Sequence, residues 1–332
     1  MGRTVLAAAA AAAMLALPHV ITVPYLVHLL VMTFIYVMLA LSYDLVVGHL
    51  GALSLGHAAF FGVGAYTAGI LSTRFMTGFG TELAAAAALA MGFPVFRLSS
   101  RSLSVGTLGF AMIAQYVAHN WIDLTRGPMC ITGIPYPSLS LPGFGQWRAV
   151  TLADQYYVAL ALCVVVVAVI RRVIHSRVGR SLHALRDDEA LAASMGIPPL
   201  RYKMVAFALG AAIAGIAGAF WARYVTIVCP TEMSLNLTID LLVIVFLGGV
   251  GSVRGVVIGA VLVAFLPEML RITPSLRLVI YGALLLVLIL RMPEGIDGMI
   301  RRWEQRWRAR GAPPGGGGTA PAWEPRDGGQ MA

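Results

Sequence analysis

The stretch GHLGALSLGHAAFFGVGAYTAGIL, residues 48–71, is rich in glycine and alanine and also contains two histidines and a serine. Read as a helix, it places small side chains on one face at intervals of four and three. These are Ser54, Ala58, Gly62, Ala65 and Gly69. Small residues let two helix backbones approach closely in lipid, so the stretch predicts a tightly packed membrane helix. Similar faces recur at Gly210, Ala214 and Gly218 and at Gly251, Gly255 and Gly259.

The composition supports a membrane protein. Hydrophobic residues make up 59% of the 332 positions and charged residues only 12%, with a mean hydropathy of +0.82. A soluble domain has about a quarter of its residues charged. The apolar runs lack the period-two alternation of a membrane β-barrel. We therefore predict an all-α, polytopic integral membrane helical bundle.

We predict about ten membrane-spanning helices, with eight as the lower limit because several apolar runs are shorter than the roughly 20 residues that a span needs. The ten are residues 5–22, 25–47, 51–72, 82–97, 103–119, 155–171, 204–223, 238–251, 255–270 and 276–290. A signal peptide is the alternative interpretation of the first run. We count it as a span because no clear small-residue cleavage motif follows it.

The positions of the basic residues along the chain account for the net charge of +9. With the N-terminus inside, these spans place most of the 24 Lys and Arg residues on the cytoplasmic side. The exceptions are Arg74, Arg126, Arg148, Arg223, Arg271 and Arg277. This asymmetry follows the positive-inside rule. It predicts a multi-pass inner-membrane protein with both termini in the cytoplasm, surrounded by lipid, and with no nucleic-acid partner.

We expect one membrane domain over residues 1–300, with two hydrophilic interruptions. The external loop, 120–154, is rich in proline and glycine and is expected to consist of turns. The other interruption is a cytoplasmic loop over residues 171–203. The tail, 301–332, is basic and then rich in glycine and proline, which predicts disorder.

The cytoplasmic loop predicts a short helix. Ser181 is a candidate N-cap, the helix would run to about Met195, and Gly196 would end it before Pro198 and Pro199. Small residues edged by charges would give this helix a docking surface for another protein. They are Arg186, Asp187, Asp188, Glu189, Ala190, Ala192 and Gly196. A helix exposed only to solvent is the alternative.

The motifs argue against an enzyme. The chain lacks an HExxH zinc motif, a GxSxG elbow and a GxxxxGK[ST] phosphate loop, so we expect no catalytic residue, no metal and no cofactor. Energy for transport would have to come from an ion gradient or from another polypeptide. Asp44 and Asp240 are our candidate intramembrane carboxylates, and both lie near the ends of spans. We interpret Cys130 and Cys229 as unpaired, with an external disulfide as the alternative.

Three stretches together resemble a known family. They are SYDLVVGHLGALSLGHAAFFGVGAYTAGIL, RVGRSLHALRDDEALAASMGIPPLRYKMVAFALGAAIAGIAGAFWARY and TIDLLVIVFLGGVGSVRGVVIGAVLVAFLPEMLR. Their order and content resemble the M-type permease subunits of branched-chain amino acid ABC importers. The resemblance implies a subunit that moves leucine, isoleucine or valine, with urea, amides or other amino acids as alternative substrates.

The resemblance also implies partners. These are a second, homologous H-type permease, two cytoplasmic ATPases that supply the energy, and an external solute-binding protein. The loop helix from Ser181 to Gly196 would be the coupling helix that enters an ATPase cleft. Two readings compete with this one: a stand-alone ion-coupled carrier and a membrane scaffold that transports nothing.

Candidate residues for lining the pathway or for helix packing come from the opening stretch. They are Gly48, Gly51, Ser54, Gly56, His57, Gly62 and Gly64. His57 could contact substrate or tie one helix to the next, and both readings stay open. The chain departs from the family pattern at Asp44, His49 and Ala52, which leaves the substrate less defined than the fold.

Overall fold

The computed structural model describes residues 14–19, 23–92, 100–141, 145–269, 282, 286 and 295–310. The predicted spans 5–22 and 276–290 fall largely outside the described residues. Of the predicted tail, 301–332, residues 311–332 fall wholly outside them, and the basic part before them is helical as far as Arg310.

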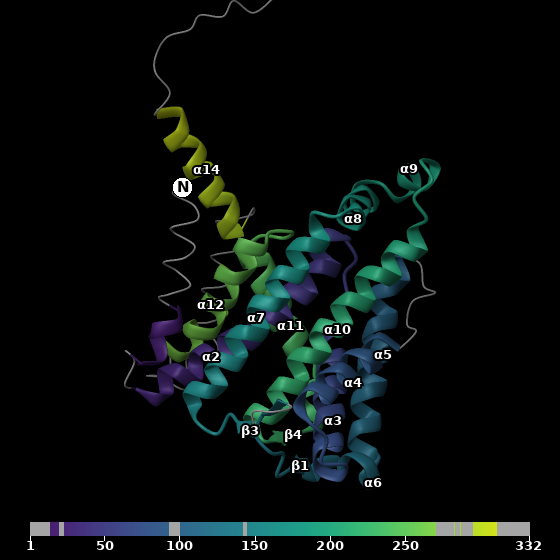
Figure 1. Cartoon of the computed structure of the whole chain (residues 1–332). Coiled ribbons are helices and arrows are strands. Elements are labelled where there is room, and N and C mark those ends of the chain that lie inside the picture. The colour runs from purple at the N-terminus through teal and green to yellow at the C-terminus, as the bar shows by residue number, and fades with distance from the viewer. Residues whose placement is uncertain are drawn as a thin grey trace, which may run out of the picture.

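The described chain is mostly helical (Figure 1). Its α-helices are α2 (Pro24–Asp44), α3 (His57–Arg74), α4 (Phe79–Gly92), α5 (Ser100–Asn120), α6 (Ile122–Thr125), α7 (Leu152–Ile174), α8 (Arg177–Asp187), α9 (Glu189–Ser194), α10 (Pro199–Val225), α11 (Leu235–Gly248), α12 (Val253–Met269) and α14 (Gly295–Arg310). Among the described residues, three helical stretches are long and apolar enough to cross a membrane: Pro24–His49, Leu152–Ile174 and Pro199–Val225.

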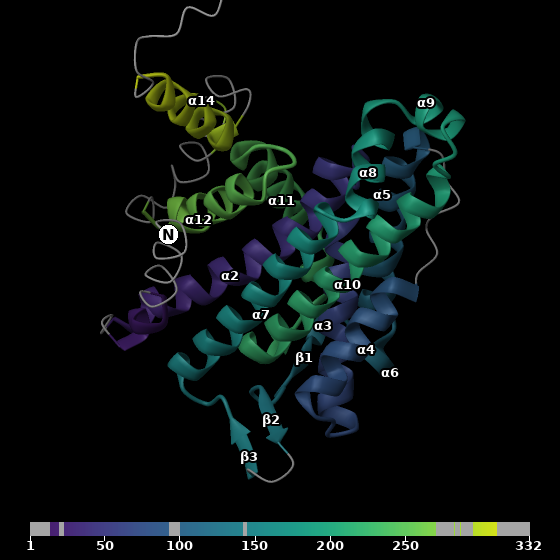
Figure 2. The ribbon, with the colours of Figure 1, turned by 45° about the horizontal axis from the view of Figure 1, so that its top comes forward.

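The bundle has two different ends (Figures 1 and 2). We call one the α9 end, because α8 and α9 lie there, and the other the strand end. At the strand end, β2 (Ser138–Leu141) and β3 (Gly145–Arg148) form an antiparallel hairpin. There β1 (Ile131–Thr132) also pairs antiparallel with β4 (Ile227–Val228). The segment that we expected to consist of turns therefore contains short strands as well.

Cys130 and Cys229 form a disulfide, so our preferred interpretation of unpaired cysteines was wrong. The strand register gives the physical reason. Ile131 pairs with Val228, which places the residue before one strand opposite the residue after the other. The two Cα atoms are 4.5 Å apart, although 99 residues separate the cysteines along the chain.

The predicted span 51–72 was wrong at its beginning. After α2 the chain makes one π-helical turn, η1 (Leu45–His49), and is then non-helical until His57. Gly51 has a φ of +76°, in the left-handed region, and this conformation breaks the helix. Ser54 therefore does not share a helical face with Gly62.

The predicted loop helix was also wrong in its extent, because it is two helices. Ser176, rather than Ser181, caps α8 by accepting a hydrogen bond from the Val178 amide. Asp188 has extended backbone, ends α8 and caps α9 through the amides of Ala190 and Leu191. Gly196 follows α9 with a φ of +84°, and α10 begins at Pro199.

Glycines allow α3 and α10 to pack closely. A Cβ atom at Gly64 would lie only 2.6 Å from the carbonyl carbon of Gly215 on α10. A Cβ atom at Gly218 would lie 2.9 Å from the carbonyl carbon of Phe61 on α3. Real Cβ atoms do not approach backbone so closely, so neither position has room for a side chain. The predicted close packing at Gly218 is confirmed, and α4 covers the same region of α10.

Candidate functional site

A polar network lies at the α9 end, where α2 passes into η1. We call it the Asp44 network: Asp44, Gly48, His49, Arg186 and Gly251. The Asp44 side chain is buried, and its Oδ1 accepts a hydrogen bond of 2.8 Å from the backbone amide of Gly251. Its Oδ2 lies 3.4 Å from Nδ1 of His49. One carboxylate thus joins the end of α2 to the turn between α11 and α12.

Arg186 connects α8 to the same network. Its guanidinium donates a hydrogen bond to the carbonyl oxygen of Gly48. A Cβ atom at Gly48 would lie 2.6 Å from the amide nitrogen of Gly251, and one at Gly51 would lie 2.9 Å from Cγ of Arg186. Both glycines therefore leave the space into which the loop helix and the α11–α12 turn fit. The π-turn, α8 and the α11–α12 turn meet at this point.

His183, one turn before Arg186 on α8, faces this network. Its ring centroid lies 5.2 Å from that of His49. Burial is the main cause that lowers the pKa of His183, and the neighbouring His49 and Arg186 act in the same direction. A lowered pKa keeps the His183 imidazole neutral at neutral pH. The ring therefore adds no positive charge beside Arg186.

The short helix α9 has an inner and an outer side. Ala192 is buried in an apolar cluster with Leu45 and Phe207, which come from η1 and α10. Leu191 and Met195, one turn apart, are exposed by 60% and 77%. These two exposed apolar side chains make the outer side of α9 a candidate contact surface.

The predicted docking residues divide between these two sides. Arg186 and Ala192 make contacts within the chain. Glu189 accepts a 2.6 Å hydrogen bond from Nζ of Lys203, which ties the beginning of α9 to α10. The rest of the set is exposed: Asp187, Asp188, Ala190 and Gly196.

Ser54, Gly56 and His57 lie deeper in the bundle. Ser54 is buried and has no hydrogen-bond partner among the described residues. Gly56 precedes α3 and packs against the Thr107 backbone of α5, whose hydroxyl accepts a 3.0 Å hydrogen bond from the Leu55 amide.

His57 is the first residue of α3 and is fully buried. Its Nε2 lies 2.8 Å from Oγ of Ser42 on α2. The Ser42 hydroxyl donates to the Leu39 carbonyl, so Nε2–H of the imidazole is the donor in the contact with Ser42. The ring also packs edge-on against Tyr43. This geometry supports the reading in which His57 ties α3 to α2.

Gly62 and Gly64 lie on different faces of α3. Gly64 contacts α10, as described above. A Cβ atom at Gly62 would lie 2.8 Å from Cε of Met233, in the 3₁₀ turn η3 (Pro230–Met233). Of the seven residues predicted from the opening stretch, the structure thus brings Gly48 and Gly51 to the Asp44 network. The other five lie in contacts between helices or in the segment that precedes α3.

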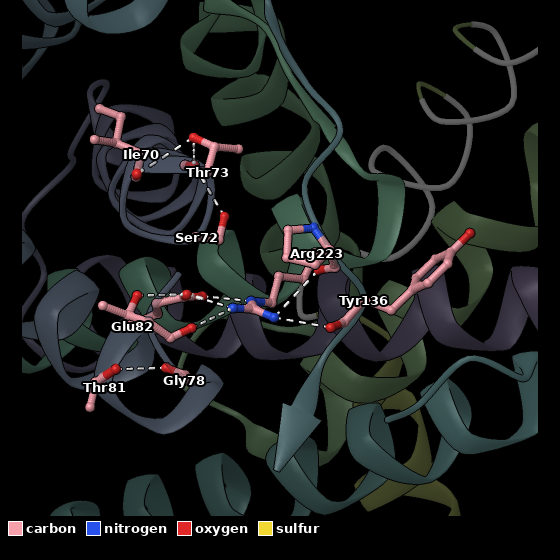
Figure 3. A network of polar contacts seen from close by, with 11 residues as sticks. Ile70, Ser72, Thr73, Gly78, Thr81, Glu82, Tyr136 and Arg223 are labelled. Carbon is pink, nitrogen blue, oxygen red and sulfur yellow. Dashed lines mark hydrogen bonds and ion pairs between the residues drawn. The ribbon is translucent and has the colours of Figure 1, made fainter. Parts of the chain in front are cut away.

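A second polar cluster lies at the strand end (Figure 3). We call it the Glu82–Arg223 cluster. Nε and one terminal nitrogen of Arg223 on α10 donate to the two carboxylate oxygens of Glu82 on α4, each at 2.5 Å. The guanidinium also donates to the carbonyl oxygens of Tyr136 at 3.0 Å and of Thr77 at 3.2 Å. Both charged side chains are 1% exposed or less. The cluster joins α4, α10 and the segment before β2.

Sequence reasoning assigned no role to Glu82, His183, Arg223 or the Gly251 amide. Arg223 and Asp44 could have been recognised from the sequence, because each is a charged residue inside an apolar run. Nothing in the sequence pairs Arg223 with Glu82, because 141 positions separate them. The bond between Asp44 and Gly251 spans 207 positions and involves a backbone amide, which leaves no trace in side-chain patterns.

Comparison with known proteins adds to this geometry. Residues 25–289 match the family described as branched-chain amino acid transport system permease component. The chain is 34% identical over 299 residues to the high-affinity branched-chain amino acid transport system permease protein LivM of Salmonella typhimurium and to that of Escherichia coli. Each match covers 83% of this chain and 70% of the relative. The permease protein LivH of Salmonella typhimurium is 25% identical over 293 residues, which cover 79% of this chain and 91% of LivH. No solved structure matches the chain.

Proposed function

Because this chain belongs to the family of branched-chain amino acid transport permease components, we propose that it is a permease subunit of an ABC importer for leucine, isoleucine and valine in the inner membrane. The observation that carries the proposal is the family match, which runs from α2 through α12. A permease for urea, amides or other amino acids is the alternative within the same architecture.

The membrane arrangement follows from the apolar helices and the distribution of charge. We propose about ten spans with both termini in the cytoplasm. The α9 end would then face the cytoplasm and the strand end the periplasm. The disulfide between Cys130 and Cys229 supports this orientation, because disulfides persist in the oxidising periplasm and are rare in the cytoplasm.

The α8–α9 segment is the proposed site of coupling to ATPase partners. Leu191 and Met195 on the outer side of α9 would enter an apolar cleft of the ATPase, with Asp187 and Asp188 at the edge of the contact. Movement of α9 would reach the membrane helices by two routes. One is the apolar contact of Ala192 with Leu45, and the other is the hydrogen bond from Arg186 to Gly48.

The alternating-access step would follow from this connection. The Asp44 network holds α8, η1 and the α11–α12 turn together. A displacement of α8 would therefore move the end of α2 and the α11–α12 turn at the same time. Glycines between α3 and α10 leave no large side chains interlocked between the two helices, so α3 and α10 can slide against each other. The chain would perform no hydrolysis itself, because ATP would be bound and hydrolysed by the partners.

We propose two further partners. A homologous H-type permease would form the other half of the pathway, which is supported by the similarity of this chain to LivH as well as to LivM. An external solute-binding protein would deliver the amino acid at the strand end.

Reconstitution tests the proposed function. The chain would be placed in liposomes with and without an H-type permease, the ATPases and the binding protein, and uptake of labelled leucine would be followed. We expect uptake only with all partners and ATP. Uptake by this chain alone under an ion gradient would support the secondary carrier instead. Transport in no condition, with the complex intact, would favour the scaffold.

A further inference from the structure

A polar pocket of about 580 Å³ opens at the α9 end, and two members of the Asp44 network, His49 and Gly251, form part of its wall. It lies between the end of α7, the beginning of α12 and α14. Arg171 and His175 line it from the end of α7, Arg254 from α12, and Asp297 and Arg301 from α14. The proposed function uses none of these five residues.

The charges in this pocket do not balance. Asp297 is the one carboxylate among the lining residues, and it is buried. It pairs with Arg301 on the same helix, with 2.6 Å between Nε and Oδ2. The pairing satisfies one cation and leaves Arg171 and Arg254 without a carboxylate among the residues that line the pocket. The pocket therefore attracts an anion.

The chemistry of the lining favours a phosphate group. Guanidinium groups donate paired hydrogen bonds whose geometry matches phosphate oxygens, and two of them approach the pocket from different helices. Ser252 and the first residues of α12 also line the pocket. The beginning of a 17-residue helix adds the positive end of its dipole to the same side.

Features of α14 indicate where the phosphate would come from. Ile296 packs against the apolar core, which fixes the beginning of the helix to α11 and α12. Met299 and Trp303, one turn apart, are exposed by 56% and 62%. Exposed apolar residues on a basic helix are typical of a helix at a membrane surface. Basic pockets between helices on the cytoplasmic side attract anionic lipid headgroups.

We propose that this pocket binds the phosphate group of an anionic phospholipid in the cytoplasmic leaflet. The lipid would lie between α7, α12 and α14, with its phosphate on Arg171 and Arg254. The proposal goes beyond transport and rests on the proposed function only for the side of the membrane. A lipid bound here would join α14 to the α11–α12 turn, which is itself bonded to Asp44.

The test uses the full-length chain in a neutral detergent and measures its thermal unfolding midpoint. Dioctanoyl phosphatidylglycerol is titrated, with dioctanoyl phosphatidylcholine and inorganic phosphate as separate arms. We expect phosphatidylglycerol to raise the midpoint more than phosphatidylcholine does, because the choline cation offsets the charge of the same phosphate; an equal rise would overturn the selectivity for an anionic lipid. Arg171→Gln and Arg254→Gln should each weaken the apparent affinity for phosphatidylglycerol about tenfold, the effect of losing a charge-assisted hydrogen bond.

The matched control is Arg172→Gln, the neighbouring arginine on α7, which does not line the pocket. It should bind phosphatidylglycerol like the unchanged chain. Equal weakening by Arg172→Gln, or no weakening by the two pocket variants, would overturn the proposal. An equal midpoint shift with inorganic phosphate alone would keep the anion site but overturn its assignment to lipid. The readout needs no transport partner, so failure of the proposed function would not affect it.

Discussion

At the scale of single residues, the strand end contains two charged groups that are buried together and satisfy each other. These are Glu82 and Arg223: both are excluded from solvent, and each carboxylate oxygen has a donor. Removing one partner of a buried ion pair leaves the other charge uncompensated. The pair therefore matters for the stability of the strand end more than a pair at the surface would.

We predict that Glu82→Gln lowers the free energy of unfolding by about 3 kcal/mol, because it leaves the guanidinium of Arg223 buried without a counter-charge. The measurement is chemical or thermal unfolding of the purified chain in detergent. The double variant Glu82→Gln with Arg223→Met removes both charges and should recover part of the loss. An unchanged unfolding free energy in the single variant would contradict the stabilising role.

The residue scale is also where sequence reasoning failed most often. The polar residues Asp44 and His57 could be recognised as unusual in an apolar segment, but their partners could not. Ser42 and Gly251 carry no signal that selects them among other serines and glycines. Pairing depends on the three-dimensional arrangement of the helices, which a local pattern does not contain.

At the scale of elements, the loop helix divides into α8 and α9 because Asp188 prefers to cap. Its short carboxylate accepts hydrogen bonds from two amides of the next turn, and an extended backbone at Asp188 makes this possible. The break allows α8 to hold Arg186 against η1 while α9 presents Leu191 outwards.

This division predicts separable effects of two substitutions. Leu191→Asp should reduce co-purification of the ATPases, because it places a charge in the proposed apolar contact. Arg186→Gln should leave co-purification intact but reduce leucine uptake several-fold, because it removes the connection to Gly48. Arg180→Gln, on the exposed side of α8, is the control for both measurements. Loss of ATPase binding in Arg186→Gln would show that docking and transmission are not separate.

At the scale of the whole molecule, hydrophobicity was sufficient to locate most helices. The predicted spans 25–47, 155–171 and 204–223 correspond to Pro24–His49, Leu152–Ile174 and Pro199–Val225. Long apolar runs have one solution in lipid, a helix, so their position follows from composition. The turns around Gly51 and Asp188 were missed, because local backbone conformation overrides the apolar pattern there.

The disulfide predicts a property of the whole fold, because it closes a loop that contains α7, α8, α9 and α10. The variant Cys130→Ser should lose about 2–4 kcal/mol of stability, as expected for a cross-link that restricts a long unfolded loop. Thermal unfolding without reductant measures the loss, and dithiothreitol should lower the midpoint of the unchanged chain but not of the variant. Reaction of both cysteines with an impermeant maleimide in unreduced cells would contradict the bond.

The π-helical turn η1 also determines how far the residues after it are rotated about the axis of α2. A π-turn holds one residue more than an α-turn, and each residue of an α-helix advances the chain by about 100°. The surplus residue between Leu45 and His49 therefore sets the rotational offset between α2 and everything that follows. Deleting one residue between Leu45 and Val47 would rotate the Gly48 carbonyl by about 100°, away from Arg186, although Arg186 itself would be unchanged. The hydrogen bond from Arg186 to the Gly48 carbonyl, which connects the loop to the membrane helices, therefore depends on the number of residues in η1 as well as on the arginine side chain.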